Sequence, residues 1–209
     1  MKFYDCKSAP SPRRARMYIA EKGIDIETLE VDLGKQEQLS DAFREINPRC
    51  TVPVLELDDG TRLTENAAIA SYLEAQYPDP PLLGRTPTEV GVIANWNARV
   101  ELEGLWPLAD VLRNESRGMA DRAITGPTNY AQIPELAERS RAQGTEFFEI
   151  LNERLGEASY VGGDHFSVAD ITALIVVDFA GWVKLGPAEE HEHTRKWHTG
   201  VSQRPSASL

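Results

Sequence analysis

The chain has 209 residues, of which 41% are hydrophobic and 26% are charged, a composition typical of a globular protein with a full core. Its formal net charge of −11 disfavours nucleic acid and anionic membranes as partners, because their phosphate groups would be repelled. Cys6 and Cys50 follow no metal-ligand or C-x-x-C spacing, and no cationic-then-apolar segment opens the sequence, so we expect a reducing, cytoplasmic setting.

The first 77 residues alternate between strand-like and helix-like patterns. They predict a strand at 2–4, a helix at 13–23, an exposed strand at 24–33, a helix at 37–46, two strands flanking the turn 58–60, and a helix at 67–77. This β-α-β-α-β-β-α order predicts a parallel strand pair joined by a right-handed crossover, with a hairpin added at one edge.

A stretch with four prolines, "PDPPLLGRTP", follows and is typical of a domain linker. We place the linker at 79–87, between an N-terminal domain at 1–78 and a C-terminal domain at 88–209. No convincing strand appears beyond it. The fold class expected is therefore α/β followed by all-α.

The second half shows only helical periodicity. Apolar residues favour helices over 93–112, with a kink at Pro107, over roughly 134–155, and over 167–183. Ser167 and Asp170 form a capping-box pattern at the start of the last of these. Its apolar stretch, 171–183, is too short to span a bilayer.

Two further groups of residues could have a function. Trp96, Trp106 and Trp182 lie on apolar faces of the expected helices, which predicts core positions. The segment "EEHEHTRKWH" at 189–198 clusters histidines and glutamates, but its spacing suits no single helix face. We interpret it as a solvated linker before a final helix and expect no metal.

Three segments resemble the cytosolic glutathione S-transferase family, particularly its bacterial members. They are "APSPRRARMYIAEKGI", "NPRCTVPVLELDDGTRLTENAAIASYLEAQYP" and "FSVADITAL". The resemblance implies a thioredoxin-like N-terminal domain, an all-helical C-terminal domain, and a homodimer. It also implies an enzyme of detoxification that joins the thiolate of its co-substrate glutathione to small apolar electrophiles. A glutathione-dependent peroxidase or thiol-transferase, and a glutathione-binding protein without turnover, remain as alternatives.

Glu65 and Asn66 stand at the start of the Ala-rich helix, where free N–H groups favour an anion. The γ-glutamyl end of glutathione carries both a carboxylate and an ammonium group. We expect Asn66 to cap the helix and donate to the carboxylate, and Glu65 to accept from the ammonium. The alternative is that this pair only caps the helix.

Val52 and Pro53 precede the hairpin, and the resemblance implies a cis bond between them that turns the backbone of Val52 outward. The cysteinyl backbone of glutathione would then pair with this edge. Thr51 stands where the family often has Lys or Gln, and Cys50 where it often has Gly. These two differences leave open which residues contact the glycyl carboxylate of glutathione, and Arg49 is a candidate for that contact.

The thiol of glutathione needs an activator that stabilises its thiolate. The candidates are Tyr4, Cys6, Ser8 and Ser11, in or shortly after the first strand, and Tyr4 fits the strand core. We favour Ser11 as a helix N-cap before Pro12, with Arg13 and Arg14 adding positive potential. Ser8 and Cys6 remain alternatives. The resemblance also makes Trp96, Asn97 and Trp106 candidate contacts of the electrophile.

Overall fold

The computed structural model describes residues 1–209, which divide into two compact units. The first unit contains Met1–Pro80, Thr125–Asn129 and Leu209, and the second contains Pro81–Ile124 and Tyr130–Ser208. The boundary between them falls inside the proline-rich stretch.

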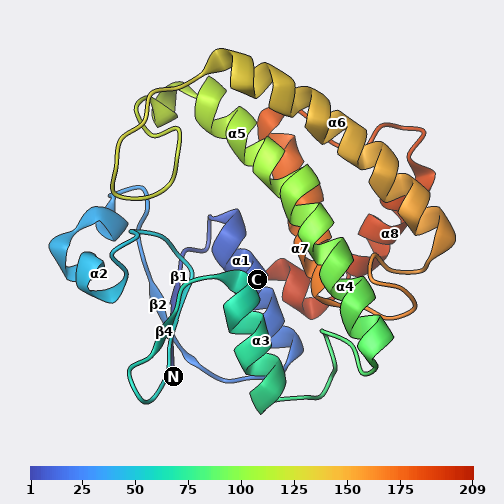
Figure 1. Cartoon of the computed structure of the whole chain (residues 1–209), viewed down its shortest axis with the longest axis horizontal. Coiled ribbons are helices and arrows are strands. Elements are labelled where there is room, and N and C mark those ends of the chain that lie inside the picture. Colours follow the sequence, from blue (N-terminus) through green and yellow to red (C-terminus); the bar gives the residue numbers. More distant parts are fainter. The chain divides into compact units, whose positions relative to one another are not determined.

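The first unit is a thioredoxin-like domain. Its elements are β1 (Lys2–Asp5), α1 (Pro10–Glu21), β2 (Glu27–Glu30), α2 (Asp41–Ile46), β3 (Val54–Glu56), β4 (Arg62–Leu63) and α3 (Asn66–Gln76) (Figure 1). The strands form one sheet in the order β2-β1-β3-β4, in which β1 pairs parallel with β2 and antiparallel with β3. The predicted order of elements and the hairpin are confirmed.

Helices pack on both faces of this sheet because residues along β1 alternate in direction. Tyr4 points to one face and meets the ring of Phe43 from α2 edge to face, with 6.2 Å between ring centroids. Asp5 points to the other face, where both of its carboxylate oxygens accept from Nη1 of Arg16 in α1, at 2.6 and 2.7 Å. Tyr4 is therefore a packing residue, as its strand position predicts.

A buried polar network holds α1 and α3 side by side (Figure 1). Nζ of Lys22 lies 2.5 Å from the carboxylate of Glu74 and also donates to the carbonyls of Tyr77 and Pro80. Glu74 accepts from the hydroxyl of Tyr18 as well. Burial, together with Glu74, raises the pKa of Tyr18, so the phenol keeps its proton and donates it. This network fixes α3 against α1.

The second unit is all-helical. Its elements are α4 (Pro87–Arg99), α5 (Trp106–Glu115), α6 (Pro134–Glu157), α7 (Val168–Ala180) and α8 (Glu192–Val201), with a π-helical stretch at Val100–Leu105 between α4 and α5. The kink expected at Pro107 therefore takes the form of a widened helix just before it. Proline has no N–H to donate, so the hydrogen bonding must change there.

The capping box at the start of α7 is present, as predicted. Oδ2 of Asp170 accepts from the N–H and the hydroxyl of Ser167, both at 3.0 Å. Oδ1 accepts from the N–H of Val161 at 2.9 Å and from Nε1 of Trp197 in α8 at 3.0 Å. One carboxylate thus joins α7, the preceding loop and α8.

Several expectations for packing and helix bounds were wrong. The helix expected at 37–46 is a 3₁₀ turn, Glu37–Leu39, followed by α2, because Ser40 has an extended backbone and caps α2 by accepting from the N–H of Phe43. The segment 189–198 is not a linker, since α8 begins at Glu192.

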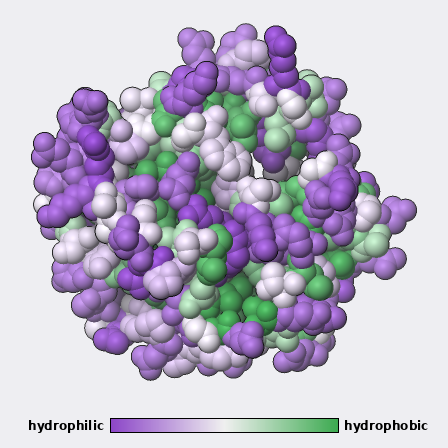
Figure 2. Space-filling view, turned by 180° about the vertical axis from the view of Figure 1, so that it is seen from behind, coloured by the Kyte–Doolittle hydropathy of each residue, from purple (hydrophilic) through white to green (hydrophobic).

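The tryptophans also differ from the expected core positions. Trp106 and Trp182 are 56% and 57% exposed. Trp96 is half-buried, with the guanidinium groups of Arg99 and Arg154 at 4.6 and 5.1 Å from its ring centroid. Hydrophilic side chains cover much of the face shown in Figure 2. None of the helices combines the length and the apolar character that crossing a membrane would need.

Candidate functional site

Ser11 lies in the first turn of α1, but it does not cap the helix as predicted. The helix begins at Pro10, and Ala9, with φ −101° and ψ 136°, occupies the cap position. Pro10 starts the helix because its fixed φ is already helical and its missing N–H is not needed there. The hydroxyl of Ser11 is consequently not used in capping.

The start of α1 has few free donors. Pro10 and Pro12 carry no N–H, and the N–H of Arg13 donates to the carbonyl of Ala9. The N–H of Ser11 is therefore the single unpaired main-chain donor of this first turn, and the Ser11 hydroxyl lies next to it. The helix dipole adds partial positive charge at the same place.

Asn66 is the first residue of α3, and Glu65 occupies the cap position, so the prediction that Asn66 caps the helix was wrong. Neither side chain caps the helix, which also contradicts the alternative that this pair serves only as a cap. Glu65 is exposed. The N–H groups of Asn66, Ala67 and Ala68 have no partner within the chain, since the first helical bond is from Ile69 to the carbonyl of Glu65.

The packing of α1 against α3 brings two predicted site residues into contact. Nδ2 of Asn66 donates to Oγ of Ser11 at 3.0 Å, across 55 residues of sequence. Oδ1 of Asn66 is buried and has no hydrogen-bond partner. Two uncapped helix N-termini therefore meet at one hydrogen bond between polar side chains.

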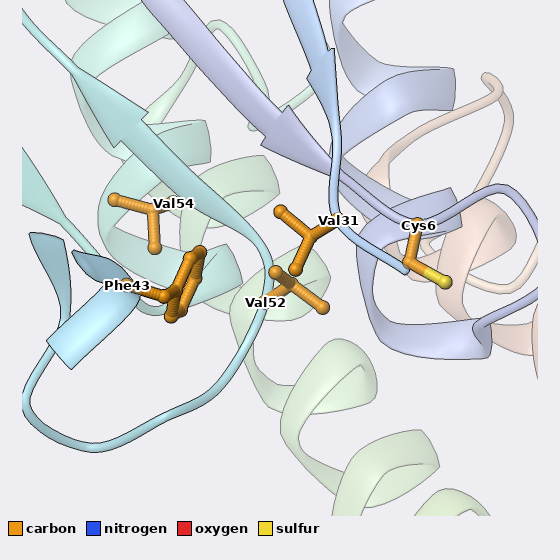
Figure 3. Close-up of a cluster of buried hydrophobic side chains, with 5 residues drawn as sticks. All are labelled: Cys6, Val31, Phe43, Val52 and Val54. Carbon is orange, nitrogen blue, oxygen red and sulfur yellow. The ribbon is translucent and has the colours of Figure 1, made fainter. Parts of the chain in front are cut away.

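The Val52–Pro53 peptide bond is cis, as the resemblance implied. The ladder of β3 begins at Val54, and the main chain of Val52 makes no hydrogen bond within the chain. The side chain of Val52 is buried in a cluster with Cys6, Val31, Phe43 and Val54 (Figure 3). Ala9 packs against the same cluster, so the backbone edge at Val52 lies near the start of α1.

A buried asparagine that the sequence analysis missed organises the loop before this edge. Nδ2 of Asn47 donates to the carbonyl of Thr51 at 2.8 Å and to its hydroxyl at 3.0 Å. Oδ1 of Asn47 accepts from the N–H of Arg49 at 3.0 Å. No local signal in the sequence distinguishes a buried asparagine from an exposed one just after a helix.

We expect Asn47→Ala to lower the free energy of unfolding by about 2 kcal/mol, because three hydrogen bonds are lost and a typical one contributes about 0.5–1.5 kcal/mol. Denaturant unfolding of the variant measures this. Asn95→Ala, at an exposed position on α4, is the matched control and should change stability by less than about 0.5 kcal/mol. A change as small as the control's in Asn47→Ala would contradict the role assigned to Asn47.

The remaining thiol-activator candidates lie around the end of β1. Cys6 is buried, and its Sγ lies 3.4 Å from Oγ of Ser8, which is exposed. Neither residue hydrogen-bonds to Asn66. Cys50 is buried and has a positive φ of 54°. Both cysteines are free thiols.

The histidine-rich segment does not converge on a metal site. Nδ1 of His191 accepts from the N–H of Ala188, and Nε2 of His198 lies 2.8 Å from the carboxylate of Asp178. No group of three or more His, Cys, Asp or Glu side chains is placed to hold a metal ion.

Comparison with known proteins gives the family. The chain matches the model of the glutathione S-transferase N-terminal domain over residues 9–76 and that of the C-terminal domain over residues 116–205. Glutathione S-transferase 2 of Saccharomyces cerevisiae is 38% identical over 209 residues, which cover 99% of this chain and 87% of that protein. Glutathione S-transferase GstA of Escherichia coli O157:H7 is 31% identical, over 90% of this chain and 86% of that protein.

Solved structures agree with the sequence matches. The crystal structure of Gtt2 from Saccharomyces cerevisiae aligns with a TM-score of 0.90 at 37% identity, over 100% of this chain and 99% of that one. A glutathione S-transferase domain-containing protein of Marinobacter aquaeolei VT8 aligns with a TM-score of 0.91 at 35% identity, over 99% of this chain and 100% of that one. Both domain models match, and relatives align over nearly the whole chain, so this chain belongs to the glutathione S-transferase family.

Proposed function

We propose that this protein is a glutathione transferase that binds glutathione in its N-terminal domain and joins the thiolate to a small apolar electrophile. The observation that carries this proposal is the hydrogen bond between Asn66 and Ser11. It unites the residue expected at the γ-glutamyl end of the tripeptide with the residue expected at its thiol, within the segment that matches the family's N-terminal domain.

The free N–H groups at the start of α3 suit the γ-glutamyl carboxylate, because a helix N-terminus combines donors with partial positive charge. The exposed carboxylate of Glu65, at the adjacent cap position, suits the ammonium group. The unpaired main chain of Val52 can pair with the cysteinyl backbone, next to Thr51 and Pro53, as an added strand would. These contacts would hold the tripeptide with its thiol near the start of α1.

Ser11 would stabilise the thiolate because its hydroxyl donates a hydrogen bond to the sulfur. Its N–H and the dipole of α1 also favour the negative charge. The thiol proton passes to solvent. The sulfur lone pair then forms a carbon–sulfur bond with the electrophile, which either loses a leaving group with its electron pair or accepts the pair and is protonated. The rate gain comes from proximity and from an anion site that is already in place.

The proposal also covers the co-substrate, the cellular role, the domain bounds and the contacts of the electrophile. Glutathione would be a co-substrate with no metal involved, and the enzyme would act in detoxification as a cytoplasmic homodimer. Residues 1–78 would form the glutathione-binding domain, 79–87 the linker and 88–209 the helical domain. The half-buried Trp96 and Asn97 and the exposed Trp106 remain candidate contacts for the electrophile.

We expect the protein to be retained on immobilised glutathione, to be released by the free tripeptide, and to conjugate glutathione to members of a broad panel of apolar electrophiles. Failure to bind would contradict the proposal. Binding without turnover on electrophiles or peroxides would indicate a glutathione-binding protein that is not an enzyme. Activity abolished in Cys6→Ser but kept in Ser11→Ala would indicate glutathione-dependent reduction.

A further inference from the structure

We propose that Asn66 is a positioning residue for Ser11: its amide holds the serine hydroxyl so that the hydroxyl proton is directed at the sulfur of glutathione. This inference rests on the proposed function and adds a role for Asn66 beyond binding the tripeptide. It is carried by the 3.0 Å hydrogen bond from Nδ2 of Asn66 to Oγ of Ser11.

The direction of this hydrogen bond determines what Ser11 can do. An amide NH₂ group can only donate, so Oγ of Ser11 receives this bond on a lone pair. The Ser11 hydroxyl makes no other hydrogen bond within the chain. Serines deeper in a helix often donate to the carbonyl four residues earlier, but Ser11 is the second residue of α1 and has no helical carbonyl there. Its proton therefore remains available to a ligand.

The surroundings of Asn66 support this orientation of the amide. With Nδ2 on Ser11, Oδ1 is the atom left buried and without a partner. Turning the amide over would bury an unpaired N–H group in its place, and native proteins tolerate unpaired buried donors less often than under-satisfied acceptors. The amide therefore donates to Ser11, and the unpaired Oδ1 is the smaller of the two costs.

The framework around the pair is rigid enough for such a role. Ser11 and Asn66 meet at the N-terminal ends of α1 and α3, while Lys22 joins the C-terminal ends of the same two helices through Glu74 and the carbonyl of Tyr77. Both ends of the helix pair are thus tied. A site that must hold a hydroxyl in one direction benefits from supporting contacts of this kind.

The test replaces Asn66 by Ser, whose shorter side chain cannot reach Oγ of Ser11. The readout is the pKa of the thiol of bound glutathione, titrated by the ultraviolet absorbance of the thiolate, so it does not depend on turnover. We expect Asn66→Ser to raise this pKa by about 0.5–1, the change that corresponds to one net hydrogen bond. The pH profile of kcat/KM should move to higher pH by the same amount.

A double-mutant cycle separates positioning from binding. Ser11→Ala with Asn66→Ser should raise the thiol pKa no more than Ser11→Ala alone, because Asn66 acts through Ser11. Asn66→Ala should behave like Asn66→Ser, which excludes an effect of the new hydroxyl. Asn95→Ser, the same change at an exposed position on α4, should not shift the pH profile of kcat/KM.

Three outcomes would overturn the inference. Asn66→Ser could raise KM for glutathione while the thiol pKa stays constant, which would leave Asn66 a binding residue only. Ser11→Ala and Asn66→Ser could raise the thiol pKa of bound glutathione additively. The unmodified protein could fail to bind glutathione at all, and only this last result would also overturn the proposed function.

Discussion

Replacing Asp170 by Ala should lower the free energy of unfolding by about 3 kcal/mol at neutral pH. The carboxylate is buried and accepts four hydrogen bonds, from Val161, from Trp197 and twice from Ser167. Each buried donor left without a partner costs about 1–3 kcal/mol, so their loss outweighs the relief of removing a buried charge. At a few degrees per kcal/mol, Tm should fall by about 6–12 °C.

The matched control for this prediction is Asp164→Ala, because Asp164 is exposed and lies in the loop just before α7. Its effect on Tm should be within about 2 °C, as for most surface substitutions. Thermal unfolding followed by circular dichroism compares the two variants. Equal Tm values for Asp170→Ala and Asp164→Ala would show that the hydrogen bonds of Asp170 contribute little.

The same residue makes stability depend on pH. Burial raises the pKa of Asp170 from 3.8 to about 6, against the opposing effect of its four hydrogen bonds. The folded state thus holds this proton more tightly than the unfolded state, and the contribution of Asp170 to stability falls as pH rises from about 4 to about 6. The pKa difference corresponds to about 3 kcal/mol. The unmodified protein should therefore exceed Asp170→Asn in free energy of unfolding by less at pH 7 than at pH 4.

Replacing Ser11 by Ala should raise the thiol pKa of bound glutathione by about 1–2, because hydrogen bonds to charged groups contribute about 1.5–3 kcal/mol. At neutral pH, kcat/KM should fall about tenfold or more, while the affinity for glutathione changes little. Titration of the thiolate absorbance and a pH profile of kcat/KM measure both effects. The unchanged affinity would separate loss of the activator from damage to the binding site.

Ser8→Ala and Cys6→Ser test the alternatives to Ser11. Ser8 is exposed and its hydroxyl lies beside the buried thiol of Cys6, so neither substitution should alter the thiol pKa of bound glutathione. Loss of turnover in Ser8→Ala with normal turnover in Ser11→Ala would transfer the role of activator to Ser8.

The fold was largely predictable because its signals are local. The turn at Asp58-Asp59-Gly60 lies between two antiparallel strands, and Ser167 with Asp170 forms the expected capping box. Neighbouring residues alone specify a turn or a helix start. Local signals were less reliable at the two helix starts of the site. The observed caps, Ala9 and Glu65, have no capping side chain, so the preference for Ser and Asn at caps misplaced both boundaries.

The sequence by itself therefore determined the order of the elements, because turns and helix starts depend on neighbouring residues, and its resemblance to a known family implied the cis proline. Only the tertiary structure decided that Asn66 donates to Ser11, that Asn47 closes the loop before Val52, and that Trp106 is exposed. The first depends on how α1 packs against α3. Trp106 comes directly after the π-helical stretch. The wider turns of this stretch rotate the residues that follow, so the regular helical spacing of apolar residues no longer predicts which side is buried.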